Sequence, residues 1–179
     1  MIMVKNDDIY FKNLIYLIYI LVILIIIYVV SILGYKAYSA WKLNDMRNMW
    51  KESRERIIET FLANKDIFDD LIKKMYSSQQ DIIIEFSNGN IQLYVNGKEE
   101  KLDNEFYSLL NKLYSIINCE SITLRKDSSG NKVLEIYLGS KNYDKKNVFE
   151  EYILYCKDKI EGITDEFSPG WYYKVSWYT

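Results

Sequence analysis

The stretch LIYLIYILVILIIIYVVSIL, residues 14–33, decides how the rest of the chain is organised. These 20 residues contain no charged side chain, no Gly and no Pro. A helix of this length spans roughly 30 Å at about 1.5 Å per residue, which matches the hydrocarbon thickness of a bilayer. A single helix can cross lipid because it satisfies its own backbone hydrogen bonds. The sequence therefore predicts one membrane-spanning helix from Leu14 to Leu33.

Neither a buried core helix nor a cleaved signal peptide fits this apolar run as well. A buried core helix is usually shorter and carries a polar stripe, whereas only Tyr16, Tyr19, Tyr28 and Ser31 interrupt this run. A cleaved signal peptide has an apolar region of about 7–15 residues followed by a small-residue cleavage site. The run is longer than that, and residues 34–40 offer a poor site. We expect a retained signal-anchor helix in contact with the lipid bilayer.

Basic residues near the ends of the span set its expected orientation. Residues 1–13 form a short N-terminal tail that contains Lys5 and Lys12. More basic residues follow the span, at Lys36, Lys42, Arg47, Lys51, Arg54 and Arg56. Lys and Arg are enriched on the cytoplasmic side of membrane spans. This count favours a single-pass protein of the cell membrane with a cytoplasmic C-terminal domain.

The composition excludes several classes of function. The chain has 179 residues, a net charge of −2, 17 Tyr and no His. Near neutrality argues against nucleic acid as a partner, and the aromatic content argues for a packed domain. The absence of His removes His-based acid–base catalysis and nearly all catalytic zinc sites. We expect no enzymatic activity, cofactor or metal. The abundance of Lys, Ile and Asn is typical of an AT-rich bacterial genome.

Residues 34–76 predict an amphipathic stem helix. Apolar side chains recur every 11 residues, in the rows Met46, Ile57, Phe68 and Trp50, Phe61, Ile72. The two rows lie four residues apart, so they form one stripe on a helix. We favour packing of this stripe on the chain's own domain, with a coiled coil in a homo-oligomer as the alternative. A break is expected near 64–66, where Asp66 is placed to cap a second helix.

Residues 77–179 predict an α+β domain. Period-two alternation and turn residues indicate two β-hairpins, and Asp103 and Asp144 are placed to cap helices. The expected elements are strands 82–86 and 91–95, a helix 103–118, strands 122–125 and 134–138, a helix 144–161 and a strand 171–178. This ββαββαβ order is similar to the ferredoxin-like fold with one additional strand. We expect a two-layer domain with both helices on one face of an antiparallel-rich sheet.

The cysteines and the second face of this sheet leave alternatives open. Cys119 and Cys156 are either two small buried residues, which we favour, or a disulfide in an extracytoplasmic domain. The second face collects Gln92, Tyr94, Thr123, Arg125, Glu135, Tyr137, Tyr172, Lys174 and Tyr178. Tyrosine suits protein contact because it offers a rigid apolar area with a polar tip. This face either contacts a protein or is covered by Trp50 and Phe61 of the stem.

The sequence therefore favours a membrane-anchored, non-enzymatic interaction module, such as an adaptor or immunity-type protein of a bacterial membrane complex. The interface candidates are Tyr94, Arg125, Tyr137, Tyr172, Lys174 and Tyr178 on the sheet, and Trp50 and Phe61 on the stem. The alternative is a subunit of a surface filament or secretion machine, because the order of apolar helix, stem and head is similar to type IV pilins and pseudopilins. Those proteins carry a Gly before the apolar helix and a Glu shortly after it begins, whereas residues 9–44 contain no acid and residues 11–15 contain no Gly.

Overall fold

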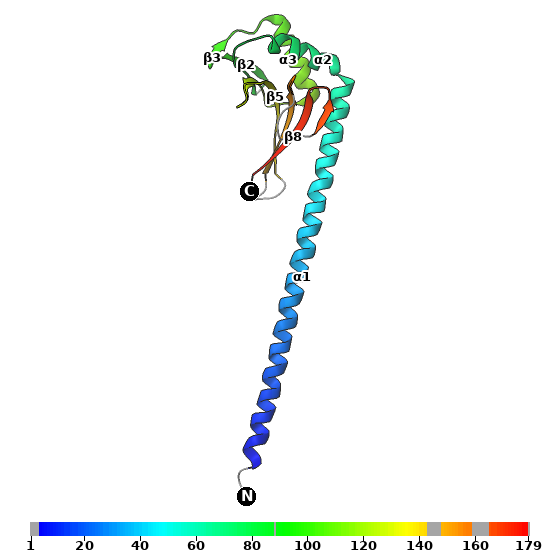
Figure 1. Ribbon diagram of the computed structural model, residues 1–179, viewed down its shortest axis with the longest axis vertical. Coiled ribbons are helices and arrows are strands. Elements are labelled where there is room, and N and C mark those ends of the chain that lie inside the picture. Colours follow the sequence, from blue (N-terminus) through cyan, green and yellow to red (C-terminus); the bar gives the residue numbers. More distant parts are fainter. Residues whose placement is uncertain (1–3, 88, 143–147, 159–164, 179) are drawn as a thin grey trace. The chain divides into compact units, whose positions relative to one another are not determined.

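The computed structural model describes residues 4–87, 89–142, 148–158 and 165–178 (Figure 1). The chain divides into two compact units, Met1–Trp50 and Lys51–Thr179. Helix α1 (Val4–Ala63) is continuous, and its residues 51–63 belong to the second unit. In the first unit the side chains from Leu14 to Leu33 are exposed along the helix. Among the described residues, α1 is the one helix long and apolar enough to cross a membrane.

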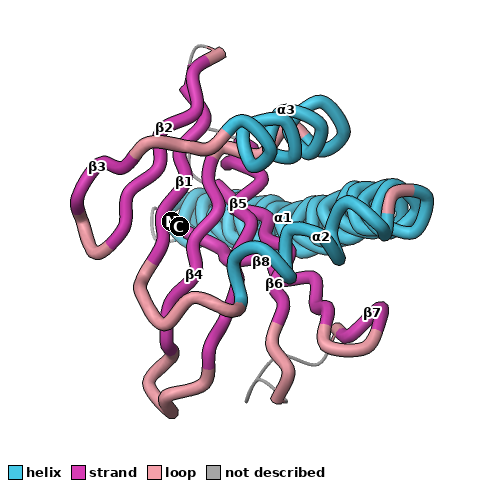
Figure 2. Tube along the Cα trace, turned by 90° about the horizontal axis from the view of Figure 1, so that it is seen from above, coloured by secondary structure: helices cyan, strands magenta, loops and turns pink. Residues whose placement is uncertain are grey.

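The second unit is an α+β domain built on one antiparallel sheet, as the sequence predicts at this coarse level. Eight strands lie in the order β3-β2-β1-β4-β5-β6-β8-β7 (Figure 2). The strands are β1 (Ile82–Ser87), β2 (Asn90–Val95), β3 (Lys98–Glu100), β4 (Ser121–Lys126), β5 (Lys132–Asn142), β6 (Val148–Tyr155), β7 (Glu166–Ser168) and β8 (Trp171–Tyr178). The helices of this unit, besides the end of α1, are α2 (Lys65–Tyr76) and α3 (Asn104–Ile117).

The helix ends follow local capping rules. Asn64 separates α1 from α2, and its side-chain amide donates to the carbonyl of Thr60 (2.9 Å). The sequence predicts Asp66 as the cap of α2, but this residue lies inside the first turn, where a carboxylate favours the helix dipole. Asp103 caps α3 by accepting a hydrogen bond from the Phe106 amide (2.7 Å). Asn118 ends α3 in the left-handed conformation, with a φ of 47°.

The hydrophobic core lies between one face of the sheet and the helices. Phe61 of α1, Phe68 of α2 and Leu110 of α3 pack with strand residues such as Ile84 and Trp171 in one cluster. Within the second unit, the apolar stripe of the stem therefore packs in the core of its own domain. Burial of a large apolar side chain of this kind contributes about 1.5–3 kcal/mol to stability.

The predicted helix 144–161 is wrong, because residues 148–155 form β6 between β5 and β8. Residues 143–147 and 159–164, including Gly162 at the expected end of this helix, lie outside the described residues. The same side chains fit a strand, since Phe149, Glu151 and Ile153 alternate as buried positions. The ferredoxin-like ββαββαβ order is therefore absent from the described chain. The sequence pattern does not predict strands β3 and β7, and β5 continues to Asn142, beyond residue 138, where the predicted strand ends.

Candidate functional site

The strand register places two rows of side chains on the face of the sheet that points away from the helices of this unit. We call these rows the open face. One row contains Tyr94, Ile83, Thr123, Glu135, Leu154 and Tyr172; the other contains Gln92, Glu85, Ser121, Tyr137, Tyr152 and Lys174. Among the described residues, the buried apolar side chains of the helices belong to the main core, and the small apolar cluster on the open face contains no helical residue.

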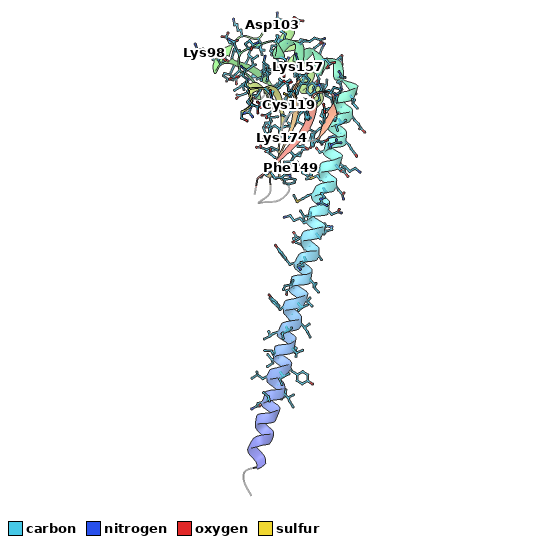
Figure 3. The ribbon with its side chains drawn as sticks, viewed as in Figure 1. Lys98, Asp103, Cys119, Phe149, Lys157 and Lys174 are labelled. Atoms are coloured by element: carbon cyan, nitrogen blue, oxygen red, sulfur yellow. The ribbon has the colours of Figure 1, made fainter. Side chains whose placement is uncertain are left out.

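Two tyrosines in contact mark the centre of the second row. The rings of Tyr137 and Tyr152 have centroids 5.1 Å apart, and both side chains are partly exposed. The Tyr152 hydroxyl donates a hydrogen bond to the Glu150 carboxylate. Lys174 on β8 (Figure 3) places its ammonium nitrogen 5.3 Å from the centre of the Tyr152 ring. Lys174 and both rings therefore form one continuous polar–aromatic surface.

Local charge affects the Tyr137 hydroxyl. Burial raises the pKa of Tyr137, and the carboxylates of Glu150 and Glu120 raise it further. Tyr137 therefore stays neutral at physiological pH, and its hydroxyl is suited to hydrogen bonding. Beside it, Arg125 forms an ion pair with Glu135 (3.5 Å), so these two opposite charges largely cancel.

Not all the predicted interface residues are available to a partner. Tyr94, Arg125, Tyr137 and Lys174 lie partly or well exposed on or beside the open face, as the alternation indicates.

Tyr172 occupies the same face but is only 4% exposed, because it packs with Val133, Leu154 and Cys156 in the small cluster. Tyr178 ends β8, and its side chain lies outside the described residues.

Of the two stem candidates, Phe61 does not form part of the open face. Phe61 is fully buried on the opposite side of the sheet, with its ring 4.7 Å from Phe68 and 4.9 Å from Trp171. It therefore neither covers the tyrosine-bearing face nor presents itself to another subunit. Trp50 is the last residue of the first unit and lies outside the sheet-bearing one.

Sequence reasoning missed Tyr152 and Glu150 because both fall in the predicted helix 144–161. On a helix these two residues point in different directions, whereas on a strand they share a face. The signal that could have placed them is the composition of Val148–Tyr155, in which β-branched and aromatic residues predominate, as is typical of strands.

A second polar cluster lies on the helix-bearing side of the sheet. Glu151 is buried, accepts a hydrogen bond from the Tyr173 hydroxyl (2.7 Å) and forms an ion pair with Lys141. Lys141 also donates to the hydroxyl of Ser53 on α1 (2.9 Å). Burial alone would raise the pKa of Glu151, but hydrogen bonds from Lys141, Ser53 and Tyr173 outweigh it, so this pKa is lowered. These contacts hold the end of α1 on the sheet.

Lys141 and Glu151 of this cluster line a cleft of about 310 Å³ together with Arg56, Thr60 and Leu138. Next to it, the guanidinium of Arg54 donates to the carboxylate of Asp165 (2.6 Å), the residue before β7, and adds a second link between α1 and the sheet domain. Each charged group at the centre of the cluster already has a partner. The arrangement therefore suits a structural attachment better than a reactive site.

The described residues contain no group of three or more His, Cys, Asp or Glu arranged to hold a metal ion. Cys119 and Cys156 are free, buried and placed in different apolar clusters, and burial raises the pKa of Cys119 to about 12. Comparison of the chain with protein families, characterised proteins and solved structures found no match. Its function is therefore inferred from helix α1 and the open face.

Proposed function

We propose that this protein is a single-pass membrane protein that binds another protein through the open face of its sheet and catalyses no reaction itself. Helix α1 supports the membrane part of this proposal. Its residues from Leu14 to Leu33 expose apolar side chains all round the helix, and burying that surface in lipid removes it from water. The aromatic residues Tyr35, Tyr38 and Trp41 follow the span, where such rings favour the membrane–water interface.

The observation that carries the interaction part is the contact pair Tyr137 and Tyr152 on a sheet face that the described helices of the same unit leave uncovered. Large rigid side chains with polar tips dominate protein interfaces because they lose little entropy on binding. A domain that needed this face only for solubility would fill it with short polar or charged residues.

Photocrosslinking in native membranes tests the interaction. The photoreactive residue p-benzoylphenylalanine replaces Tyr94 on the open face or, as a matched control, Tyr107, which is 43% exposed on α3. We expect a discrete crosslinked protein from position 94 and none from position 107. Tyr137→Ala should then abolish the crosslink at 94 while the domain stays folded. Equal crosslinking at the two positions, or none at 94, contradicts the proposed interface.

Membrane insertion and orientation have their own test. Carbonate extraction should leave the full chain in the membrane pellet, and release into the supernatant contradicts the proposed span. Protease treatment of intact cells that carry a C-terminal tag then reads the topology. We expect the tag to survive in intact cells and to be lost after lysis. Loss of the tag from intact cells would place the domain outside and favour the filament-subunit or secretion-machine alternative.

A further inference from the structure

Three carboxylates surround the two central tyrosines of the open face. Glu150 accepts the hydrogen bond from the Tyr152 hydroxyl. Glu85 stands in the same cross-strand row as Tyr137, two strands away, which corresponds to about 10 Å. Glu120 lies close enough to Tyr137 for its charge to raise the pKa of that tyrosine. We call these three acids and two tyrosines the acidic tyrosine patch.

The backbone makes room for one of these acids. Gly139 follows the irregularity in the pairing of β5 with β6 and has a φ of +104°, a conformation that L side chains rarely adopt. A Cβ on Gly139 would lie 2.6 Å from a carboxylate oxygen of Glu120. The glycine therefore lets the Glu120 carboxylate lie against β5, near Tyr137.

The patch already accommodates a cation from its own chain. The Lys174 ammonium lies over the Tyr152 ring, so a positive charge of the chain itself already occupies a face of this ring. In formal charge, Lys174 offsets one of the three carboxylates. The neighbouring ion pair of Arg125 and Glu135 adds no net charge. The patch therefore keeps an excess of about two negative charges at physiological pH.

We propose that the acidic tyrosine patch binds an arginine-rich segment of the protein partner, with a guanidinium stacked on the Tyr137 ring beside Tyr152. This inference rests on the proposed function and names the chemistry of the partner. A guanidinium matches the patch because it stacks on aromatic faces and donates paired hydrogen bonds to carboxylates. The shape of the site agrees, since the two rings are tilted by 35° to each other and both are partly exposed.

Fluorescence anisotropy with a defined probe tests this inference. The full chain is placed in nanodiscs of uncharged phosphatidylcholine lipid and titrated with a fluorescein-labelled peptide of four Arg-Gly repeats. We expect binding that weakens as salt is added, because exposed charges are screened. The combined Glu85→Gln, Glu120→Gln and Glu150→Gln variant should bind about tenfold more weakly. Tyr137→Leu keeps all three acids and should weaken peptide binding about threefold, because it removes the ring on which the guanidinium stacks.

A matched control separates the patch from overall charge. Glu52→Gln, Glu59→Gln and Glu105→Gln together make the same change in net charge at exposed helical positions and should leave the affinity unchanged. Equal weakening in the control variant, unchanged binding in the patch variant, or no binding by the wild type at about 1 mM peptide overturns the inference.

Crosslinking from position 94 distinguishes failure of the arginine-binding inference from failure of the proposed function. A crosslink that persists undiminished in the patch variant overturns the arginine-binding role and leaves the interaction surface in place. Absence of the crosslink in the otherwise wild-type chain removes the proposed interaction surface itself.

Discussion

Replacing Phe61 by alanine tests whether the last turns of α1 are a structural part of the sheet domain. Phe61 is fully buried, and its ring lies 4.7–5.0 Å from the rings of Phe68, Phe167 and Trp171. The substitution removes the ring from a site that three other elements enclose, so the cavity has little freedom to collapse. The matched control is Leu62→Ala, one position along the same helix, where the leucine is 57% exposed.

The expected loss in the free energy of unfolding follows from the enclosure of Phe61. Truncation of a buried phenylalanine to alanine costs about 3–5 kcal/mol, and three aromatic neighbours place Phe61 at about 4 kcal/mol. A domain of this size is stable by about 5–15 kcal/mol, so the variant should lose a large share of its stability. Leu62→Ala should change stability by less than about 0.5 kcal/mol, because it removes an exposed side chain and substitutes a good helix former.

Pulse proteolysis of the full chain in mild detergent, across a urea series, measures both variants. Resistant domain is quantified at each urea concentration, and the midpoints give the difference in the free energy of unfolding. A loss of less than about 1 kcal/mol for Phe61→Ala, or equal losses for the two variants, would refute the placement of Phe61 in the core.

Two further predictions concern the polar cluster and the end of α3. The pKa of Glu151 is lowered in the folded state from an ordinary value of 4.5, so its contribution to stability is present above pH 4.5 and is lost as the pH falls through the lowered pKa. Glu151→Gln should therefore be less stable than the wild type at pH 7 and lose less stability on acidification, and parallel pH profiles would contradict this. Asn118 has a φ of 47°, so Asn118→Ala should cost about 1 kcal/mol in urea denaturation, whereas Asn118→Gly should stay close to the wild type.

Local signals predict much of the fold correctly. Gly89, which has a positive φ of 79°, lies in the turn before β2 of the first hairpin, and Asp103 fixes the start of α3, because short-range chemistry determines both. The alternation in β2, β4 and β5 places Tyr94, Arg125 and Tyr137 near a common face, since side chains on a strand point to alternate sides.

The rest depends on non-local pairing that periodicity does not encode. Residues 148–155 fit both a helical and a strand pattern, and pairing with β5 and β8 decides the outcome. On a helix, the acidic pair Glu150 and Glu151 would be solvated charge. On the strand the two residues separate, with Glu150 on the open face and Glu151 buried beside Lys141 and Tyr173. This is why sequence reasoning missed the acid that contacts Tyr152.

The two outermost strands of the sheet affect whether copies of this protein can pair edge to edge at high concentration. Strand β3 consists of Lys98, Glu99 and Glu100, all exposed, and an added strand would have to pair beside these charges. Strand β7 is three residues long, pairs irregularly with β8 and is followed at once by Pro169, which lacks an amide hydrogen. Short, charged or interrupted edges resist edge-to-edge aggregation. Neighbouring copies at high local concentration would therefore not pair edge to edge into a continuous sheet.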